Sequence, residues 1–207
     1  MDENVKHGTT TVGIIAKDGV VLVADKRATM GHLIAHKHVD KILPITDRIV
    51  MTTAGAVGDA QMLVKYLQAE MSLYETKRYK KPSVTVAANL LANILFGNRM
   101  NFRPFFVQLL LAGYDETGPH LFSLGADGSN LEDKYISTGS GSVMAYGVLE
   151  DKFKEGLSIP EAIKIGARAV KAAISRDVYT GNGVDVYTIT KEGYKKLSKE
   201  EIDKILS

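Results

Sequence analysis

Three consecutive threonines near the beginning of the chain are the first residues that could carry out chemistry. They lie within residues 8–13, whose sequence is GTTTVG. A β-branched run of this kind is typical of an ordinary strand, and that interpretation requires no chemistry. The alternative is that Thr9 is a latent nucleophile. A threonine hydroxyl is a poor nucleophile without a base, and a free α-amino group on the same residue can act as that base near neutral pH.

The residue before Thr9 fits the second interpretation. Because Gly8 has no Cβ, the Thr9 hydroxyl can approach the Gly8 carbonyl closely. Cleavage of the bond between the two residues would free the Thr9 amine. A chain that keeps residues 1–8 has this base locked in a peptide bond, so we expect such a chain to be inactive.

A carboxylate and an amine farther along the chain could tune such a nucleophile. Asp25 ends one apolar strand pattern, and Lys41 begins another. Each residue taken alone is most simply a surface charge. If both side chains point at Thr9, however, the lysine charge lowers the proton affinity of the hydroxyl and the amine, while the aspartate keeps the lysine ionised and oriented.

Residues 52–59, with the sequence TTAGAVGD, indicate a strand that runs directly into a helix. A tight strand–helix turn would explain this segment without any function. The functional alternative is an oxyanion hole, because backbone N–H groups in the first turn of a helix lack intrahelical partners and point outward.

Hydrophobic periodicity predicts the elements that must position these residues. Strands are expected at 9–16, 20–25, 33–38, 41–44 and 48–53, then a helix at 57–74 and a second one from the N-cap Ser83 through Asn98. Next come strands at 105–114, 120–124 and 135–138, helices at 142–154 and 159–176, strands at 184–190 and 193–197, and a terminal helix at 198–206. This order predicts an α+β fold of four layers, in which two antiparallel sheets pack face to face and a helix pair covers each outer side.

Composition limits the classes of protein that remain. The chain has 207 residues, 45% of them hydrophobic, which fits one domain with a substantial core. It has no cysteine, which excludes disulfides, thiolate metal sites and a cysteine nucleophile. The formal net charge of +2 comes without a basic block, so we expect no nucleic-acid partner. Residues 1–8 lack the apolar core of a signal peptide and no apolar run could span a bilayer, so we expect no membrane association and a cytoplasmic location.

Three histidines, at positions 32, 36 and 38, are the remaining candidate metal ligands. In a strand only His36 and His38 share a face, and no acidic residue falls at ligand spacing. We therefore expect that the protein uses neither a metal nor another cofactor.

Taken together, these segments resemble the proteasome β subunits, most closely those of archaea. The similarity extends from Thr9 to about Thr190 in the order of the family's motifs. The resemblance implies the N-terminal-nucleophile hydrolase fold and a threonine protease, with residues 1–8 as a propeptide removed by autolysis and 9–207 as one catalytic domain. The segments that carry it are GTTT at 8–11, DKRAT at 25–29, Lys41, AGAVGDA at 54–60, TGSGS at 138–142, AYGVLE at 145–150 and RDVYTGNG at 176–183.

The resemblance also implies roles for individual residues around the reacting bond. Thr9 matches the nucleophile, and Gly8 matches the residue before the bond that is processed. Asp25 and Lys41 match the pair that tunes the nucleophile, and the N–H of Gly55 matches the oxyanion donor. Their chemistry is hydrolysis of a peptide bond through an acyl-enzyme ester.

A second group matches residues that support the site. Ser140, Asp177 and Thr180 match the group that orients the threonine amine and a nearby water, and Arg27 matches a structural charge. Position 180 is threonine where serine is commoner in the family, so the hydroxyl is kept and only its fine positioning differs.

Substrate binding is implied in the same way. Thr29 and the backbone of Gly55 match the edges that pair with an extended substrate, a β-augmentation contact. The main specificity pocket is small and mainly apolar, which favours hydrophobic residues before the cleaved bond. Its lining matches Ala28, Val39, Thr53 and Val57.

Assembly is a further implication of the resemblance. The family forms seven-membered β rings stacked between α-subunit rings, so that unfolded polypeptides are hydrolysed in a closed chamber, fed indirectly by an AAA ATPase unfoldase that acts through the α ring. The apolar helix after Ser83 and the exposed faces of the helix at 57–74 are candidate ring surfaces.

Three alternatives compete with this interpretation. An N-terminal-nucleophile amidohydrolase of small amides could use the same threonine chemistry, but the motifs at 145–150 and 176–183 argue against it. The bacterial two-ring peptidase related to proteasomes has shorter chains that lack much of the 142–183 pattern. A non-catalytic scaffold subunit would have no need of Thr9, Asp25 and Lys41 together.

Overall fold

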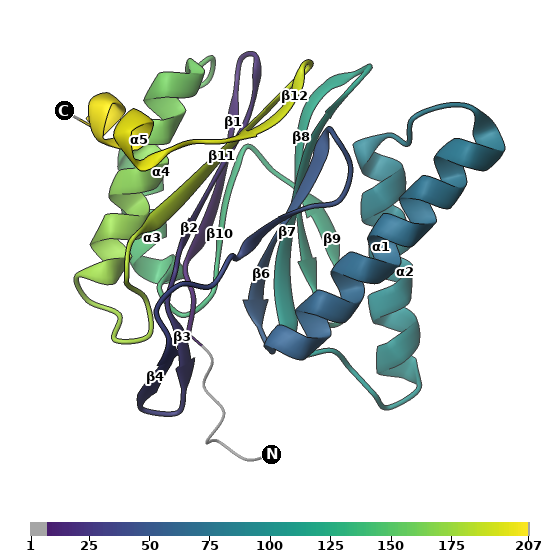
Figure 1. The fold of residues 1–207 in the computed structure, drawn as a ribbon, viewed down its shortest axis with the longest axis horizontal. Helices are drawn as coiled ribbons and strands as arrows, with labels where there is room; N and C mark the ends of the chain where they lie inside the picture. Colours follow the sequence, from purple (N-terminus) through teal and green to yellow (C-terminus); the bar gives the residue numbers. More distant parts are fainter. Residues whose placement is uncertain (1–7, 207) are drawn as a thin grey trace.

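The computed structural model describes residues 8–206, which form two five-stranded antiparallel sheets that face each other (Figure 1). The first sheet has the strand order β10 (Tyr135–Thr138), β1 (Thr11–Ala16), β2 (Gly19–Asp25), β11 (Val184–Thr190) and β12 (Gly193–Lys196). The second has the order β5 (Ile42–Pro44), β6 (Ile49–Gly55), β7 (Val107–Asp115), β8 (Gly118–Gly125) and β9 (Asn130–Glu132). A separate small hairpin consists of β3 (Ala28–Met30) and β4 (Leu33–His36).

Helices cover the outer face of each sheet (Figure 1). On the second sheet lie α1 (Val57–Arg78) and α2 (Val84–Met100). On the first sheet lie α3 (Ser142–Lys152) and α4 (Ile159–Ile174), with α5 (Lys199–Leu206) beside α4. The predicted α+β sandwich of four layers is therefore confirmed.

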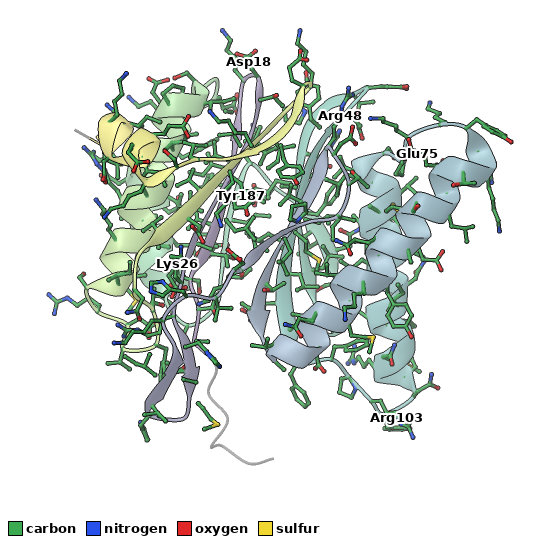
Figure 2. All side chains as sticks on the ribbon, viewed as in Figure 1. Asp18, Lys26, Arg48, Glu75, Arg103 and Tyr187 are labelled. Carbon is green, nitrogen blue, oxygen red and sulfur yellow. The ribbon has the colours of Figure 1, made fainter. Side chains whose placement is uncertain are left out.

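Three hydrophobic clusters hold the layers together. One lies between the two sheets and includes Leu22 of β2, Leu110 of β7 and Tyr187 of β11. Figure 2 shows side chains filling this space, with Tyr187 labelled there. The other two clusters join each sheet to its helices. Because β2 is central in its sheet and covered on both faces, all seven of its residues are buried.

Hydroxyl groups also join the two sheets, close to the start of β1. The Thr52 hydroxyl of β6 donates a hydrogen bond to the Thr11 hydroxyl across 3.1 Å, and the hydroxyls of Thr11 and Thr138 are 2.6 Å apart. Buried hydroxyls need such partners, since an unpaired one would lose its bonds to water without replacement. This contact fixes the spacing between the sheets at the end where Thr9 lies.

The local signals in the sequence explain how the helices begin. Ser83 accepts a hydrogen bond from the N–H of Val86 at the start of α2, as predicted for its N-cap. Ser158 and Glu161 form a reciprocal capping box at the start of α4. A two-residue turn, Lys17 and Asp18, joins β1 to β2.

Several predicted boundaries were wrong by a few residues. The helix predicted to end near Tyr74 continues to Arg78, and the strand predicted to start at Thr9 starts at Thr11. Its first two residues leave the ladder because their N–H groups bond to side chains, that of Thr10 to Asp25. The three-residue strands β3 and β9 were not predicted, because their patterns are too short to show a period.

In the part of the chain that the structure describes, no helix has the length and apolar character needed to cross a membrane.

Candidate active site

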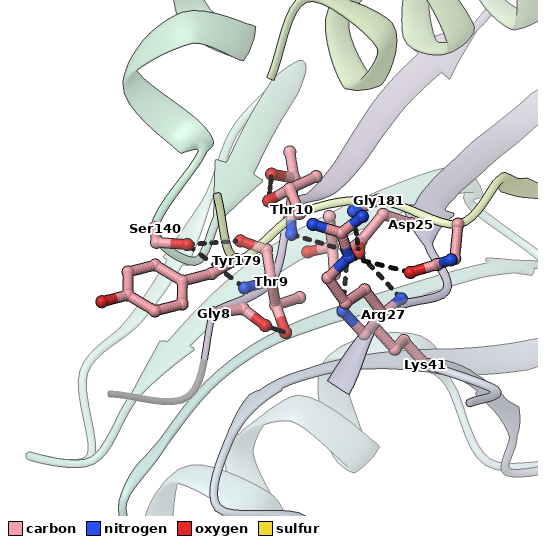
Figure 3. Close-up of polar contacts among 12 residues, drawn as sticks. Gly8, Thr9, Thr10, Asp25, Arg27, Lys41, Ser140, Tyr179 and Gly181 are labelled. Carbon is pink, nitrogen blue, oxygen red and sulfur yellow. Dashed lines mark hydrogen bonds and ion pairs between the residues drawn. The ribbon is translucent and has the colours of Figure 1, made fainter. Parts of the chain in front are cut away.

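Thr9 lies two residues before the start of β1, at the open end of the space between the sheets, and is 5% exposed. Its hydroxyl donates a hydrogen bond to the carbonyl of Gly8 across 2.7 Å. Its N–H donates to the hydroxyl of Ser140 across 3.3 Å (Figure 3). Its carbonyl accepts from the N–H of Gly141 across 3.3 Å. The nucleophile predicted from sequence is thus held on several sides.

An ion pair lies on one side of Thr9. The Lys41 ammonium donates to the Asp25 carboxylate across 2.7 Å, and the two residues are 5% and 0% exposed. Burial lowers the pKa of Lys41 below its ordinary value, and the charge of Asp25 offsets part of this effect. The ion pair places the lysine charge in a buried site, where a charge acts more strongly on its neighbours than it would in water.

Backbone groups orient the carboxylate of Asp25. One oxygen accepts from the N–H of Thr10 across 2.9 Å in addition to Lys41. The other accepts from the N–H groups of Arg27 and Gly181, across 3.0 and 2.9 Å. Because four donors converge on it, the aspartate has little freedom to turn away from the lysine.

Arg27 connects this ion pair to the segment between α4 and β11. Its guanidinium donates to the side-chain oxygen of Asn182 and to the carbonyl of Val178, both across 2.8 Å. Gly181 lies against the guanidinium, and a Cβ there would come within 2.4 Å of it. These contacts join Arg27 to the segment that carries Asp177 and Thr180.

A chain of hydroxyl groups lies on the other side of Thr9. The Asp177 carboxylate accepts from the hydroxyls of Ser140 and Thr180, across 2.5 and 2.6 Å. The Thr180 hydroxyl is also 2.8 Å from the hydroxyl of Thr10. These contacts bring together the three residues predicted to orient the amine, and they add Thr10.

A cavity of about 320 Å³ opens beside Thr9. Its walls come from the end of β6, the start of α1, the β3 segment and the residues before β5. The five predicted substrate-binding residues all line it, together with Gly8, Thr9 and Gly55. They are Ala28, Thr29, Val39, Thr53 and Val57.

The sequence matches the family described as Proteasome subunit over residues 5–189. The Proteasome subunit beta of Methanothermobacter thermautotrophicus is 52% identical to it over 98% of this chain and 96% of that protein. The Proteasome subunit beta of Methanospirillum hungatei is 54% identical over 94% of this chain and 93% of that protein, and that of Archaeoglobus profundus is 49% identical over 100% and 96%.

The chain belongs to the proteasome β-subunit family. It is accordingly a threonine endopeptidase of the proteasome core, of the kind found in archaea. The resemblance found in the motifs of the sequence is thereby confirmed over nearly the whole chain.

In this proteasome β subunit, only glycine fits at position 55 without a steric clash. Gly55 has φ of +111°, and a Cβ there would lie 2.1 Å from the carbonyl oxygen of Phe106. The backbone turns in this way directly before α1, whose N-cap Ala56 makes no side-chain cap. Gly55 lines the cavity beside Thr9, which is where an oxyanion donor would have to lie.

Some contacts of the site were missed by sequence reasoning. A Cβ on Gly8 would lie 1.6 Å from Cβ of Tyr179, so this glycine is required by a neighbour as well as by the approach of the hydroxyl. Gly139, with φ of +91°, would place a Cβ 2.1 Å from the Thr9 carbonyl oxygen. Thr10 stands beside the predicted nucleophile, but nothing in the pattern distinguished it from an ordinary strand residue.

Proposed function

We propose that this threonine endopeptidase uses Thr9 as its nucleophile and hydrolyses peptide bonds of unfolded polypeptides. The observation that carries the proposal is the placement of Thr9 between a buried Asp25–Lys41 ion pair and the Ser140 hydroxyl, at the edge of a cavity of about 320 Å³. A nucleophile, a tuning charge and a place for substrate thus meet at one point.

The enzyme first acts on its own chain. The Thr9 hydroxyl is already 2.7 Å from the carbonyl oxygen of Gly8, so it lies beside the bond to be cut. Its oxygen attacks the carbonyl carbon of Gly8, and the C–N bond to Thr9 breaks while the proton passes to the Thr9 nitrogen. Water then hydrolyses the resulting ester, which releases the Gly8 carboxylate and leaves a free amine on Thr9. Of the proposed propeptide, residues 1–7 lie outside the described residues.

Hydrolysis of a substrate repeats these steps with the free amine as base. The amine takes the hydroxyl proton as Thr9 attacks, and the Gly55 N–H stabilises the oxyanion. The amine then gives this proton to the leaving nitrogen as the C–N bond of the substrate breaks, which leaves the acyl group as an ester on Thr9. The Lys41 charge lowers the proton affinity of both groups, and Asp25 keeps that charge in place. Ser140, supported by Asp177, holds the amine toward the reacting carbon. Water finally releases the acyl group.

Substrate lies along the edges of the cavity as an extended chain, paired with the backbone near Thr29 and Gly55. Its side chain before the cleaved bond enters the space between Ala28, Val39 and Thr53. Because this space is small and largely apolar, we expect hydrophobic residues there.

Exposed apolar residues on the helices of the second sheet support assembly. Met62 and Tyr66 of α1 and Phe96 and Met100 of α2 are each at least half exposed. Such residues on the outside of a folded chain mark contacts with other subunits. We propose that they join this subunit to a seven-membered β ring between α rings in the cytoplasm, where an AAA ATPase feeds the chamber through the α ring.

The test is an intact mass of the subunit in particles assembled with a matching α subunit. We expect wild type to lose a mass equal to residues 1–8 and to cleave a fluorogenic peptide amide. Thr9→Ala should keep the eight residues and show no hydrolysis above background. Thr117→Ala, an exposed threonine on the β7–β8 turn, is the matched control and should process normally. Loss of the eight residues by Thr9→Ala, without another protease present, would contradict the proposal.

A further inference from the structure

We propose that Gln108 is a positioning residue for the Thr9 reaction, acting through the turn at residues 139–141. Its side-chain oxygen accepts a hydrogen bond from the N–H of Gly139 across 3.0 Å. This inference rests on the proposed role of Thr9 and adds to it a residue from the opposite sheet.

The position of Gln108 is unusual for its strand. Residues of β7 alternate between two buried faces, with Val107 and Leu109 packed toward the helices and Leu110 and Ala112 between the sheets. By this alternation Gln108 belongs to the face between the sheets, where apolar side chains prevail. It is exposed because it lies at the open end of that space.

The bond from Gln108 crosses the sandwich. Gln108 belongs to β7 of the second sheet, while Gly139 directly follows β10 of the first. The contact therefore ties the turn after β10 to β7, the central strand of the opposite sheet. A donor and an acceptor on different sheets fix the distance between those sheets at this point.

The turn that Gln108 holds contacts Thr9 in three ways. A Cβ on Gly139 would lie 2.1 Å from the Thr9 carbonyl oxygen, so backbone and nucleophile are already as close as glycine allows. The Ser140 hydroxyl accepts from the Thr9 N–H across 3.3 Å, and the Gly141 N–H donates to the Thr9 carbonyl across 3.3 Å. Small movements of the turn therefore change the direction of the Thr9 nitrogen, which is the proposed base.

Loss of this bond should affect catalysis more than folding. Gln108, Gly139 and Ser140 line a second cavity of about 460 Å³, together with Gly55 and Phe106. The cavity is open, so water can satisfy the Gly139 N–H when the glutamine oxygen is removed. The fold then keeps its hydrogen bonds, while the turn loses its fixed position.

A pair of substitutions separates the acceptor from the rest of the side chain. Gln108→Leu removes the acceptor at similar volume, and Gln108→Glu keeps an oxygen in its place. Gln68→Leu is the matched control, because Gln68 donates to the Pro44 carbonyl across 2.8 Å on the exposed side of α1, outside the site. Each is compared in assembled particles, with kcat divided by the fraction of chains whose intact mass shows the loss of residues 1–8.

For Gln108→Leu we expect kcat to fall about fivefold to tenfold with KM within about twofold, the size expected for one hydrogen bond. Gln108→Glu should stay within about threefold of wild type, and Gln68→Leu should not change. A Gln108→Leu enzyme with unchanged kcat, or an equal loss in Gln108→Glu and Gln108→Leu, would overturn the inference. Thr9→Ala in the same assay separates the two claims, because hydrolysis by that variant would instead refute the proposed nucleophile.

Discussion

The polar groups on the two sides of Thr9 are of different kinds. On one side, Asp25 and Lys41 form a buried ion pair whose carboxylate also receives backbone N–H groups from three segments of the chain. On the other side, Ser140 and Thr180 reach Thr9 and Thr10 through hydroxyl groups that share the carboxylate of Asp177, which has no lysine or arginine among its hydrogen-bond donors in the part of the chain that the structure describes. The ion-pair side supplies the charge that tunes Thr9, and the hydroxyl side orients the Thr9 nitrogen.

This difference predicts unequal tolerance to change. A buried charge that loses its partner keeps the cost of leaving water without the compensating attraction. A hydroxyl that loses its partner can turn toward another or bond to water. Substitutions on the ion-pair side should therefore have larger effects on both activity and folding than substitutions on the hydroxyl side.

The largest effect is expected for Lys41→Met. It removes the tuning charge and leaves Asp25 buried and unpaired, so kcat should fall by about 10³-fold or more, with a stability loss of about 3–5 kcal/mol. Peptide hydrolysis and thermal unfolding of assembled particles measure the two losses. Lys26→Met is the control, since Lys26 pairs with Asp185 at 3.1 Å outside the site. Activity of Lys41→Met within tenfold of wild type would contradict the claim that the ion-pair side tolerates substitution less well than the hydroxyl side.

Raising the pH should also remove the Lys41 charge and lower activity, but reversibly. The pKa of Lys41 is lowered, chiefly by burial, so its charge is lost at a pH below 10.5. We expect kcat to fall about tenfold per pH unit above that lowered pKa. The folded state releases this proton more readily than the unfolded chain, so with respect to Lys41 stability rises with pH up to about 10.5.

Activity loss and unfolding should therefore separate in this alkaline range. The pH profile of kcat, followed together with particle size, measures both. Lys41→Arg keeps its charge throughout and should lack the alkaline decline, whatever its absolute rate. A decline that persists unchanged in Lys41→Arg would assign the titration to another group.

A smaller effect is expected for Asp177→Asn. The substitution removes the charge that accepts from both Ser140 and Thr180, and it introduces a donor in place of one acceptor. We expect kcat to fall about 10- to 100-fold with a small change in melting temperature. Steady-state kinetics on fully processed particles measure this loss. A loss as large as that of Lys41→Met would remove the distinction between the two sides.

The smallest effect is expected for Thr180→Ser. The hydroxyl that bonds to Asp177 is kept and only a buried methyl group is lost, so kcat should stay within about twofold. Thr180→Val keeps the volume and loses the hydroxyl, and it should lower kcat several-fold. A wild-type kcat for Thr180→Val together with a lower kcat for Thr180→Ser would show that the methyl packing, and not the hydroxyl, matters at position 180.

Much of this arrangement could be predicted from the sequence because its signals are local. Alternating and helical periods located the layers, and caps such as Ser83 and Ser158 located helix starts. The motif resemblance named Thr9 and Lys41, which the fold brings to one place. The contacts of Gln108 and Thr10 could not be predicted in this way. Each joins residues more than 30 positions apart, and such pairs depend on where the tertiary fold places distant segments of the chain.

The most direct test of the account is to trap the acyl-enzyme. Processed particles are mixed with a peptide ester, quenched in acid within milliseconds, digested, and analysed by mass spectrometry. We predict that the acyl group is found on Thr9, at a level that rises before steady state, and is absent in Thr9→Ala. An acyl group on Ser140 or on another residue, in particles that turn over substrate, would contradict the assignment of Thr9 as the nucleophile.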